Sequence, residues 1–267
     1  MIPDLTGTPL ADLISLPGRT AVVTASGAGL GAAIVERLAE AGAHVLVTDV
    51  DGDAAAAVAK SITTRGWSAD STAVDVTDPA QVAAAADLAV DRFGTLDIWV
   101  NNAGAYPSVP VLEITDEKWD RLLELNLRSA FTGAREAARR MIAAGRPGVI
   151  TNISSTAVFS ASAGNPAHYV SSKHGVVGLT HSLAVELGPH NIRAVSVAPG
   201  LTETPGVAYK RDTEGLGDVL DAFGRGLSAG RTGRPDDVAR VVLFAASDLA
   251  GYVTGALLPV DGGGAAA

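Results

Sequence analysis

From Thr20 onward, short runs of apolar and β-branched residues alternate with longer segments in which apolar residues recur at helical spacing. This alternation is typical of β-α-β units, in which each helix connects two parallel strands of one sheet. Buried parallel strands read as nearly continuous apolar runs. The pattern therefore predicts an α/β fold, a single doubly wound domain whose parallel sheet is flanked by helices. We expect strands at 21–24, 44–48, 73–76, 98–100, 149–153, 192–197 and 257–260.

No repeat, heptad array or low-complexity linker divides the 267 residues. We expect residues 1–19 to form an N-terminal extension and residues 20–267 to form one domain. The helical pattern over 116–144 is long for a globular protein, which suggests a break or an extended partner surface. A second strong helical pattern covers 169–187. The glycine-rich segment 205–231, of mixed charge, is predicted to be a mobile substrate-loop insertion.

Composition excludes several classes of function. The 20 basic and 29 acidic residues give a formal net charge of −9, which would repel a nucleic-acid backbone or anionic lipid, so we expect neither as a partner. The chain has no cysteine, which excludes disulfides, thiolate zinc sites and cysteine nucleophiles. Its five histidines show no metal-binding spacing, and we expect no metal. Without a recognisable secretory signal or an apolar run of about 18 residues, a cytoplasmic protein is expected.

A glycine-rich turn, Thr24-Ala-Ser-Gly-Ala-Gly-Leu-Gly31, joins the first predicted strand to the first predicted helix. Bare glycine backbone lets a dinucleotide pyrophosphate approach closely, and the free amides and dipole of the helix N-terminus attract that anion. A glycine-rich turn without any ligand is the simpler alternative, because such a motif alone is weak evidence. Its place between a strand and a helix favours a nucleotide and a Rossmann-type domain.

Asp49 stands at the end of the second predicted strand, eighteen positions after Gly31. An acid at this place can accept hydrogen bonds from both ribose hydroxyls of NAD, whereas its charge would repel the 2′-phosphate of NADP. No lysine or arginine directly follows Asp49, and Ala28 stands where a phosphate-binding base would be useful. The alternative is a solvated turn acid, since Asp51 and Asp53 follow closely. The pattern favours NAD.

Tyr169 and Lys173 are four residues apart and so lie on one face of the predicted helix. A free phenol is a poor base at neutral pH. A cation about 4 Å away, at an effective dielectric constant of about 20, would lower the pKa of the phenol by up to about three units. The pair therefore predicts that Tyr169 takes the proton of an alcohol while hydride leaves to a nicotinamide ring.

These motifs together resemble the short-chain dehydrogenase/reductase family over nearly the whole chain, from about Gly18 to Gly263. The matching segments, in the order of the family, are Thr24–Gly31 for the cofactor turn, Asp75 for an acid near adenine, Asn101–Gly104 for its N-N-A-G motif, Asn126 for its catalytic asparagine, Ser154 and Ser155 for its serine, Tyr169 with Lys173 for its active pair, and Pro199–Thr204 for the segment that meets the nicotinamide amide.

The resemblance implies that Ser155 polarises the substrate oxygen, Tyr169 exchanges the proton, and Lys173 binds the ribose and keeps the phenol acidic. Asn126 would help to hold a water that links Lys173 to solvent. Simpler structural roles stay open, since Asn126 could cap or kink its helix and Ser155 could satisfy a strand end. The implied contacts with NAD are Ser26, Gly27, Gly29, Leu30, Gly31, Asp49, Asp75, Val76, Asn102, Ala103, Gly104, Tyr169, Lys173, Pro199, Gly200, Thr202 and Thr204.

Two departures from the family pattern affect these expectations. Ala25 replaces the first glycine of the cofactor turn, so the turn is expected to be adjusted there. The spacing from Ser155 to Tyr169 is one residue longer than the commonest pattern. Ser155 is chosen over Ser154 and Thr156, because the second serine after the Asn-Ile pair is the usual one in related sequences.

Mostly apolar segments are expected to surround the substrate, which favours a medium-sized secondary alcohol or ketone, cyclic ones included. His168 is either a substrate contact or a residue that fills the helix N-terminus. An NADPH-dependent reductase of acyl-carrier or polyol substrates, and a non-catalytic nucleotide sensor on the same fold, are the alternatives. The resemblance also implies a homotetramer. The expected walls are 105–107, Val158, Phe159, Asn165, His168 and 205–223.

Overall fold

Seven parallel strands form one sheet in the order β3-β2-β1-β4-β5-β6-β7. The computed structural model describes residues 4–159, 165–213 and 215–266. The sheet grows outward in both directions from β1, so the strand order reverses between β1 and β4, and in sheets of this kind ligands bind at the carboxyl ends of the strands beside that point. The strands are β1 (Thr20–Val23), β2 (His44–Asp49), β3 (Ala69–Ala73), β4 (Ile98–Asn101), β5 (Gly148–Ile153), β6 (Ile192–Pro199) and β7 (Leu257–Val260).

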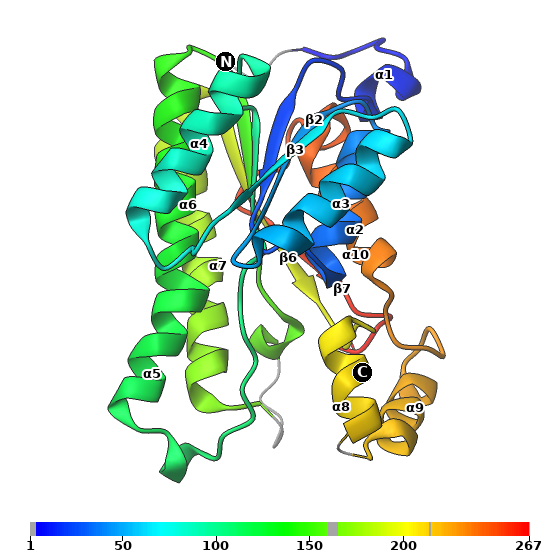
Figure 1. Cartoon of the computed structure of the whole chain (residues 1–267). Coiled ribbons are helices and arrows are strands. Elements are labelled where there is room, and N and C mark those ends of the chain that lie inside the picture. Colours follow the sequence, from blue (N-terminus) through cyan, green and yellow to red (C-terminus); the bar gives the residue numbers. More distant parts are fainter. Residues whose placement is uncertain (1–3, 160–164, 214, 267) are drawn as a thin grey trace.

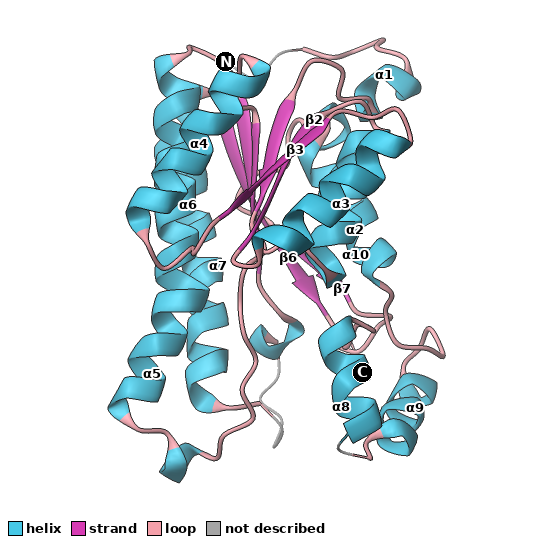
Figure 2. Cartoon of the chain, viewed as in Figure 1, coloured by secondary structure: helices cyan, strands magenta, loops and turns pink. Residues whose placement is uncertain are grey.

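Helices cover both faces of the sheet, with α4, α6 and α7 on one side and α2, α3 and α10 on the other (Figures 1 and 2). The predicted α/β, doubly wound Rossmann-type architecture is therefore confirmed. The α-helices are α1 (Leu10–Ile14), α2 (Gly29–Glu40), α3 (Gly52–Thr64), α4 (Pro79–Phe93), α5 (Asp116–Leu123), α6 (Ser129–Ala143), α7 (Ala167–Leu187), α8 (Pro205–Thr213), α9 (Gly217–Gly226) and α10 (Pro235–Ala246), with short turns η1 (Val111–Glu113), η2 (Glu124–Arg128), η3 (Thr156–Val158), η4 (Gly188–His190) and η5 (Asp248–Ala250).

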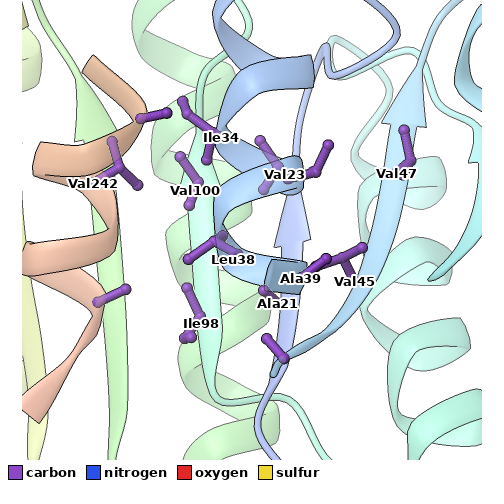
Figure 3. Close-up of a cluster of buried hydrophobic side chains, with 14 of the residues drawn as sticks. Ala21, Val23, Ile34, Leu38, Ala39, Val45, Val47, Ile98, Val100 and Val242 are labelled. Carbon is purple, nitrogen blue, oxygen red and sulfur yellow. The ribbon is translucent and has the colours of Figure 1, made fainter. Parts of the chain in front are cut away.

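Each face of the sheet carries its own apolar core. On the α2 side, Ile34 and Leu38 of α2 and Val242 of α10 pack onto Val23 and Val100 of the central strands (Figure 3). All five side chains are fully buried. Helices cover both faces of the central strands. A site can therefore form in the loops that follow the carboxyl ends of β1, β4, β5 and β6.

The third strand lies four residues before the predicted range of 73–76. β3 pairs only with β2, from Val45 beside Ala69 to Asp49 beside Ala73, and is therefore an edge strand. An edge strand is half exposed and tolerates polar residues, which is why its sequence, ADSTA, gave no apolar signal. Val74 and Val76 are buried, but they follow the strand and pack in the core under α4.

The long helical pattern over 116–144 is interrupted by a π-helical turn, η2, between α5 and α6. π-Helical turns within helices occur frequently at functional sites. The segment predicted as a substrate-loop insertion contains two helices, α8 and α9. In the described part of the chain, no helix combines the length and apolar character needed to cross a membrane.

Candidate active site

In the turn between β1 and α2, Gly27 and Gly31 stand where a side chain would collide with its neighbours. A Cβ on Gly31 would lie 2.3 Å from the carbonyl oxygen of Ala25, and one on Gly27 would lie 3.0 Å from Oδ2 of Asp49. Gly29 has a φ of +58°, which also favours glycine. No side chain caps the N-terminus of α2, so its first amides are left for an anion. These features fit a dinucleotide pyrophosphate.

The carboxylate of Asp49 is fixed beside this turn. Its Oδ2 accepts a hydrogen bond from the backbone N–H of Gly27 at 2.9 Å, and its Oδ1 accepts one from the N–H of Asp51 at 3.1 Å. The residue is the last of β2, as predicted. An acid held at this edge stands next to the glycine turn, where the ribose of a dinucleotide would lie.

Ser26 and Asn102 serve the turn from within. Ser26 is fully buried, and its hydroxyl donates to the carbonyl of Val23 at 2.7 Å and accepts from the N–H of Thr48 at 3.0 Å. The side-chain amide of Asn102 donates to the carbonyls of Thr24 and Ala25, both at 2.9 Å. The Ser26 side chain is thus engaged within the turn, and the contact of Ser26 with a cofactor stays a prediction.

Asp75 lies in the loop that follows β3, and its carboxylate is engaged locally. Oδ1 of Asp75 accepts hydrogen bonds from the N–H and the hydroxyl of Thr77 at 2.9 and 2.7 Å. Asp75 is exposed, whereas the adjacent Val76 is buried. The structure thus places Asp75 in the loop after the edge strand β3, and the hydrogen bonds with Thr77 fix the direction of its carboxylate.

Tyr169 and Ser155 meet at the start of α7. The side chain of Ser155 lies close enough to the phenol of Tyr169 to lower its pKa, whereas Ser154 is buried and donates to the carbonyl of Val197 at 3.2 Å. The two serines therefore face different partners. The longer loop between Ser155 and Tyr169 does not prevent their contact; its residues 160–164 lie outside the described part of the chain.

Lys173 lies one helical turn after Tyr169 and is almost completely buried. Its ammonium donates to the carbonyl oxygen of Ile153, at the end of β5, at 3.0 Å. Nζ is 5.8 Å from the centre of the Tyr169 ring. Burial disfavours the charged form and lowers the pKa of Lys173 to about 8. The lysine still carries its charge at neutral pH.

The predicted acidification of the phenol does not appear in this structure. Burial raises the pKa of Tyr169 above its ordinary value, Tyr106 adds to this rise, and only the neighbouring Ser155 side chain opposes it. The ammonium of Lys173 donates to the carbonyl of Ile153 and is not among the groups that lower the pKa of the phenol. In this structure the burial of the phenol therefore decides the direction of its pKa shift.

Asn126 occupies the middle of the π-helical turn and is fully buried. Its side-chain oxygen accepts from the N–H of Ala105 at 2.9 Å, and its amide donates to the carbonyl of Ala105 at 3.1 Å and to the hydroxyl of Ser172 at 3.1 Å. A Cβ on Gly104 would lie 3.2 Å from Oδ1 of Asn126 and 3.3 Å from Nζ of Lys173. Gly104 therefore keeps open the space between the amide and the ammonium.

The segment after β6 closes the site on the other side. Gly200 lies against Asp261, and Thr202 donates through its hydroxyl to the carbonyl of Gly200 at 3.0 Å. Side-chain atoms of Thr204 and Pro205 lie 3.6 to 3.7 Å from the place where Gly29 would carry a Cβ. This segment, predicted from the sequence, therefore reaches across to the glycine turn after β1.

Tyr106 is the main apolar neighbour of the candidate catalytic tyrosine. Its ring meets that of Tyr169 edge-on, with the ring centres 4.7 Å apart, and its hydroxyl donates to Oδ1 of Asn165 at 3.4 Å. Phe159, another residue expected to line the substrate site, is exposed. His168 is fully buried, and its Nδ1 has no hydrogen-bond partner among the described residues. His168 therefore packs in the interior of this structure.

Sequence reasoning did not single out two residues that shape this site. Thr24 accepts hydrogen bonds through its hydroxyl from the N–H groups of Asn102 and Ala103, at 2.9 and 3.0 Å. Asp261 packs against Gly200. Thr24 is far in sequence from Asn102, and Asp261 is far from Gly200. A local sequence pattern therefore could not reveal these contacts. Within the described ranges, no group of three histidines, aspartates or glutamates could hold a metal ion.

Comparison with known proteins agrees with this geometry. A family model described as Enoyl-(Acyl carrier protein) reductase matches residues 24–264. The crystal structure of a short-chain type dehydrogenase/reductase from Mycobacterium marinum superimposes with a TM-score of 0.88 and 34% identity, over 96% of this chain and 98% of that one. The chain belongs to the short-chain dehydrogenase/reductase family. The resemblance stated from its motifs is confirmed.

Curated members of the short-chain dehydrogenase/reductase family are oxidoreductases of CH–OH groups. The chain is 41% identical over 247 residues to cis-4-hydroxycyclohexanecarboxylate dehydrogenase of Sinomonas cyclohexanicum, covering 92% of this chain and 96% of the relative. It is 38% identical over 251 residues to 3beta-hydroxysteroid dehydrogenase 2 of Eggerthella lenta, covering 93% and 95%. The chain is thus a short-chain dehydrogenase/reductase-type oxidoreductase.

Solved family members contain either nicotinamide cofactor. A 7 alpha-hydroxysteroid dehydrogenase complexed with NADH and 7-oxo glycochenodeoxycholic acid has a TM-score of 0.89 and 34% identity, over 96% of this chain and 98% of that one. A gluconate 5-dehydrogenase from Burkholderia cenocepacia with NADP and tartrate has a TM-score of 0.88 and 34% identity, over 97% and 100%. Overall similarity therefore does not distinguish the two cofactors.

Proposed function

We propose that this protein transfers hydride between NAD and a medium-sized secondary alcohol or the corresponding ketone, with Tyr169 exchanging the proton. The observation that supports this most directly is the meeting of the Ser155 side chain and the Tyr169 phenol, one helical turn from the buried Lys173. A glycine-rich turn, suited to a pyrophosphate, lies at the same ends of the strands. A nucleotide sensor without catalysis would not need this arrangement.

In this mechanism, bound NAD supplies the hydride acceptor. Ser155 holds the substrate oxygen next to the phenol, and Tyr169 takes the hydroxyl proton at its phenolic oxygen during oxidation or donates it during reduction. Lys173 would hold the ribose of the bound cofactor and would add a positive charge beside the Tyr169 ring, from whose centre its Nζ lies 5.8 Å. Asn126, fixed by the backbone of Ala105, holds the loop around Gly104 next to the ammonium. Together these residues orient the substrate and move one proton.

Asp49 supports NAD over NADP within this proposal. A 2′-phosphate beside this carboxylate would suffer like-charge repulsion of about 1 to 4 kcal/mol. We therefore expect kcat/KM to be about 5- to 1,000-fold higher with NAD than with NADP. Asp49→Asn should lower this preference by at least about fivefold. Steady-state kinetics with both cofactors at low ionic strength, where repulsion is least screened, measure it.

Asp53→Asn provides a matched control for the cofactor experiment. It removes the same charge four residues further along the chain, in the first turn of α3, without touching the glycine turn. Its cofactor preference should stay within about twofold of the wild type. Equal use of NAD and NADP by the wild type, or a shift as large in Asp53→Asn as in Asp49→Asn, would show that Asp49 does not select the cofactor.

The activity should depend on pH through the covered phenol. Burial raises the pKa of Tyr169, so alcohol oxidation, which needs the phenolate, should increase with pH into the alkaline range. Tyr106→Ala uncovers the ring, lowers this raised pKa, and should move the rising limb of kcat/KM to lower pH. Tyr106→Phe keeps the covering ring and should move it less. An unchanged limb in Tyr106→Ala would show that Tyr106 does not set the proton affinity.

The relatives support the substrate class within this proposal. Two of them, named for a hydroxycyclohexanecarboxylate and a 3beta-hydroxysteroid, act on hydroxyl groups of rings. The side chain of Tyr106, which contacts Tyr169, and that of Phe159, four residues after Ser155 in the sequence, are both exposed. They offer apolar surface to such a ring. Oxidation of cyclic secondary alcohols with NAD, followed at the absorbance of NADH, is the direct test. Faster turnover of acyl-carrier thioesters with NADPH would favour the reductase instead.

The proposed homotetramer and cytoplasmic location stay predictions. An open groove of about 490 Å³ lies between α5, η2, α6 and α7, and Leu127, Phe131 and Leu179 are among its lining residues. An apolar groove of this kind is suited to a second copy of the chain. Light scattering at micromolar concentration should give four times the mass of 26.9 kDa. A monomeric mass would exclude the assembly.

A further inference from the structure

Ala25 has an unusual backbone conformation in the turn between β1 and α2. Its φ is +50°, in the left-handed region that favours glycine. Among the described residues, the only other non-glycine with a positive φ is Asn191, and asparagine tolerates this region far better than alanine does. Ala25 also stands at the position where the family resemblance expects glycine. Something in the surrounding structure must therefore hold it there.

Asn102, directly after β4, holds Ala25 from the next strand. Its side-chain amide donates to the carbonyl of Ala25 and to that of Thr24, each at 2.9 Å. Its backbone N–H and that of Ala103 donate to the hydroxyl of Thr24, at 2.9 and 3.0 Å. Both N–H bonds of the Asn102 amide thus end on the two carbonyls that flank the strained residue.

The conformation of Ala25 sets the course of the whole turn. Its carbonyl oxygen lies 2.3 Å from the place where Gly31 would carry a Cβ, so the first turn of α2 packs directly on this peptide. If Ala25 relaxed to a negative φ, this carbonyl would rotate away, and the backbone from Gly27 to Gly31 would change direction. The amides that would face a pyrophosphate would then no longer converge.

We propose that Asn102 is a positioning residue that keeps Ala25 in its left-handed conformation, and so holds the glycine turn in its binding shape before the dinucleotide arrives. The inference rests on the proposed function, because it takes this turn to bind NAD or NADP. Asn102 acts through Ala25 and the turn. Its amide hydrogens are not directed at the ligand.

A purely structural role for Asn102, joining β4 to β1, predicts a different outcome. In that case removal of the amide would lower stability to the same extent whatever residue stood at position 25. In the positioning role, the effect of removing the amide depends on the strain at Ala25, and glycine at that position abolishes most of it. The coupling between the two positions therefore separates the two roles.

The test is a double-mutant cycle read as binding of NADH, by the change in its fluorescence, and of NADPH in parallel. Asn102→Ala should raise the Kd by about 5- to 30-fold, because relaxation of one left-handed alanine depopulates the binding-competent turn by that factor. Ala25→Gly alone should stay within about threefold of the wild type. In the Ala25→Gly background, Asn102→Ala should again cost less than about threefold.

Ala28→Gly is the matched control, since it makes the same substitution in the same turn at an extended residue with φ of −158°. In that background Asn102→Ala should keep its full effect. If Asn102→Ala does not fold, Asn102→Ser, which is too short to reach both carbonyls, replaces it in the cycle. An equal loss in the wild-type and Ala25→Gly backgrounds, or no loss in either, overturns the inference. Absence of NADH and NADPH binding in the wild type would instead overturn the proposed function.

Discussion

Tyr169→Phe is expected to lower kcat by about 10²- to 10⁴-fold, while the affinity for NADH changes by less than about threefold. The substitution removes only the phenolic oxygen, which is the one atom that the mechanism uses to exchange the proton. Because the phenyl ring stays, the edge-on contact with Tyr106 is retained and the site keeps its shape. Alcohol oxidation measured at saturating cofactor, together with NADH fluorescence titration, checks both parts of the expectation.

Tyr252→Phe is the appropriate control for this experiment. Tyr252 is 91% exposed, so the loss of its hydroxyl should leave kcat within about twofold of the wild type. If Tyr169→Phe kept more than about a tenth of the wild-type kcat, the phenol would not be the proton carrier. Loss of NADH binding in Tyr169→Phe would point instead to a damaged site, which the unchanged cofactor affinity is meant to exclude.

The sequence predicts the architecture well because the central strands are buried on both faces. Runs such as 21–24 and 192–197 can hardly be anything other than inner parallel strands, and they lie within a residue or two of β1 and β6. β3 escapes this logic, because it pairs on one side only and its residues are half exposed. The apolar residues Val74 and Val76 are the reason why the sequence predicts the strand at 73–76, although they lie in the loop after β3.

The sequence predicts which residues form the candidate site, but it does not predict the direction in which the pKa of Tyr169 is shifted. Tyr169 and Lys173 are close because helical spacing requires it. The direction of the ammonium, toward the carbonyl of Ile153, depends on where β5 ends relative to α7, which a local pattern does not contain. The edge-on cover of Tyr169 by Tyr106 likewise joins residues 63 positions apart. Burial, with a further contribution from Tyr106, raises the pKa of the phenol.

Asn126 has a structural role of the kind that the sequence left open, while its catalytic role stays a prediction. It interrupts the long helical pattern, as a structural reading expects, and it is also the residue whose side chain fixes Ala105. The π-helical turn directs its amide into the interior toward Ser172. The length of the pattern over 116–144 suggests a break, but the spacing of its apolar residues does not specify a π-helical turn, which is rare in proteins.

Lys173→Met is expected to make the protein more stable and less active. Burial lowers the pKa of Lys173 from 10.5 to about 8, so keeping its charge at pH 7 costs on the order of 3 kcal/mol. Methionine removes this cost but loses the hydrogen bond to Ile153, which is worth about 1 kcal/mol. The free energy of unfolding at pH 7 should therefore rise by about 1 to 2 kcal/mol, while kcat/KM falls by about 10²- to 10³-fold.

The pH dependence of this gain tests its cause. In the unfolded chain the lysine keeps its proton up to about pH 10.5, whereas in the folded protein it loses the proton near pH 8. Between these values the unfolded state binds more protons, so the stability of the wild type should rise with pH relative to Lys173→Met. The advantage of the variant should therefore be largest below pH 8 and shrink toward pH 10.5. Urea unfolding at several pH values measures it.

Lys60→Met, which removes an exposed lysine from α3, should change neither stability by more than about 0.5 kcal/mol nor activity. A destabilised Lys173→Met would mean that the ammonium, with its bond to Ile153, stabilises the fold, and that the buried charge is not a cost. If Lys173→Met were more stable and equally active, Lys173 would have no role in the reaction. If Lys173→Met is more stable but less active, the buried ammonium destabilises the fold. Its charge is then kept because the reaction at Tyr169 uses it.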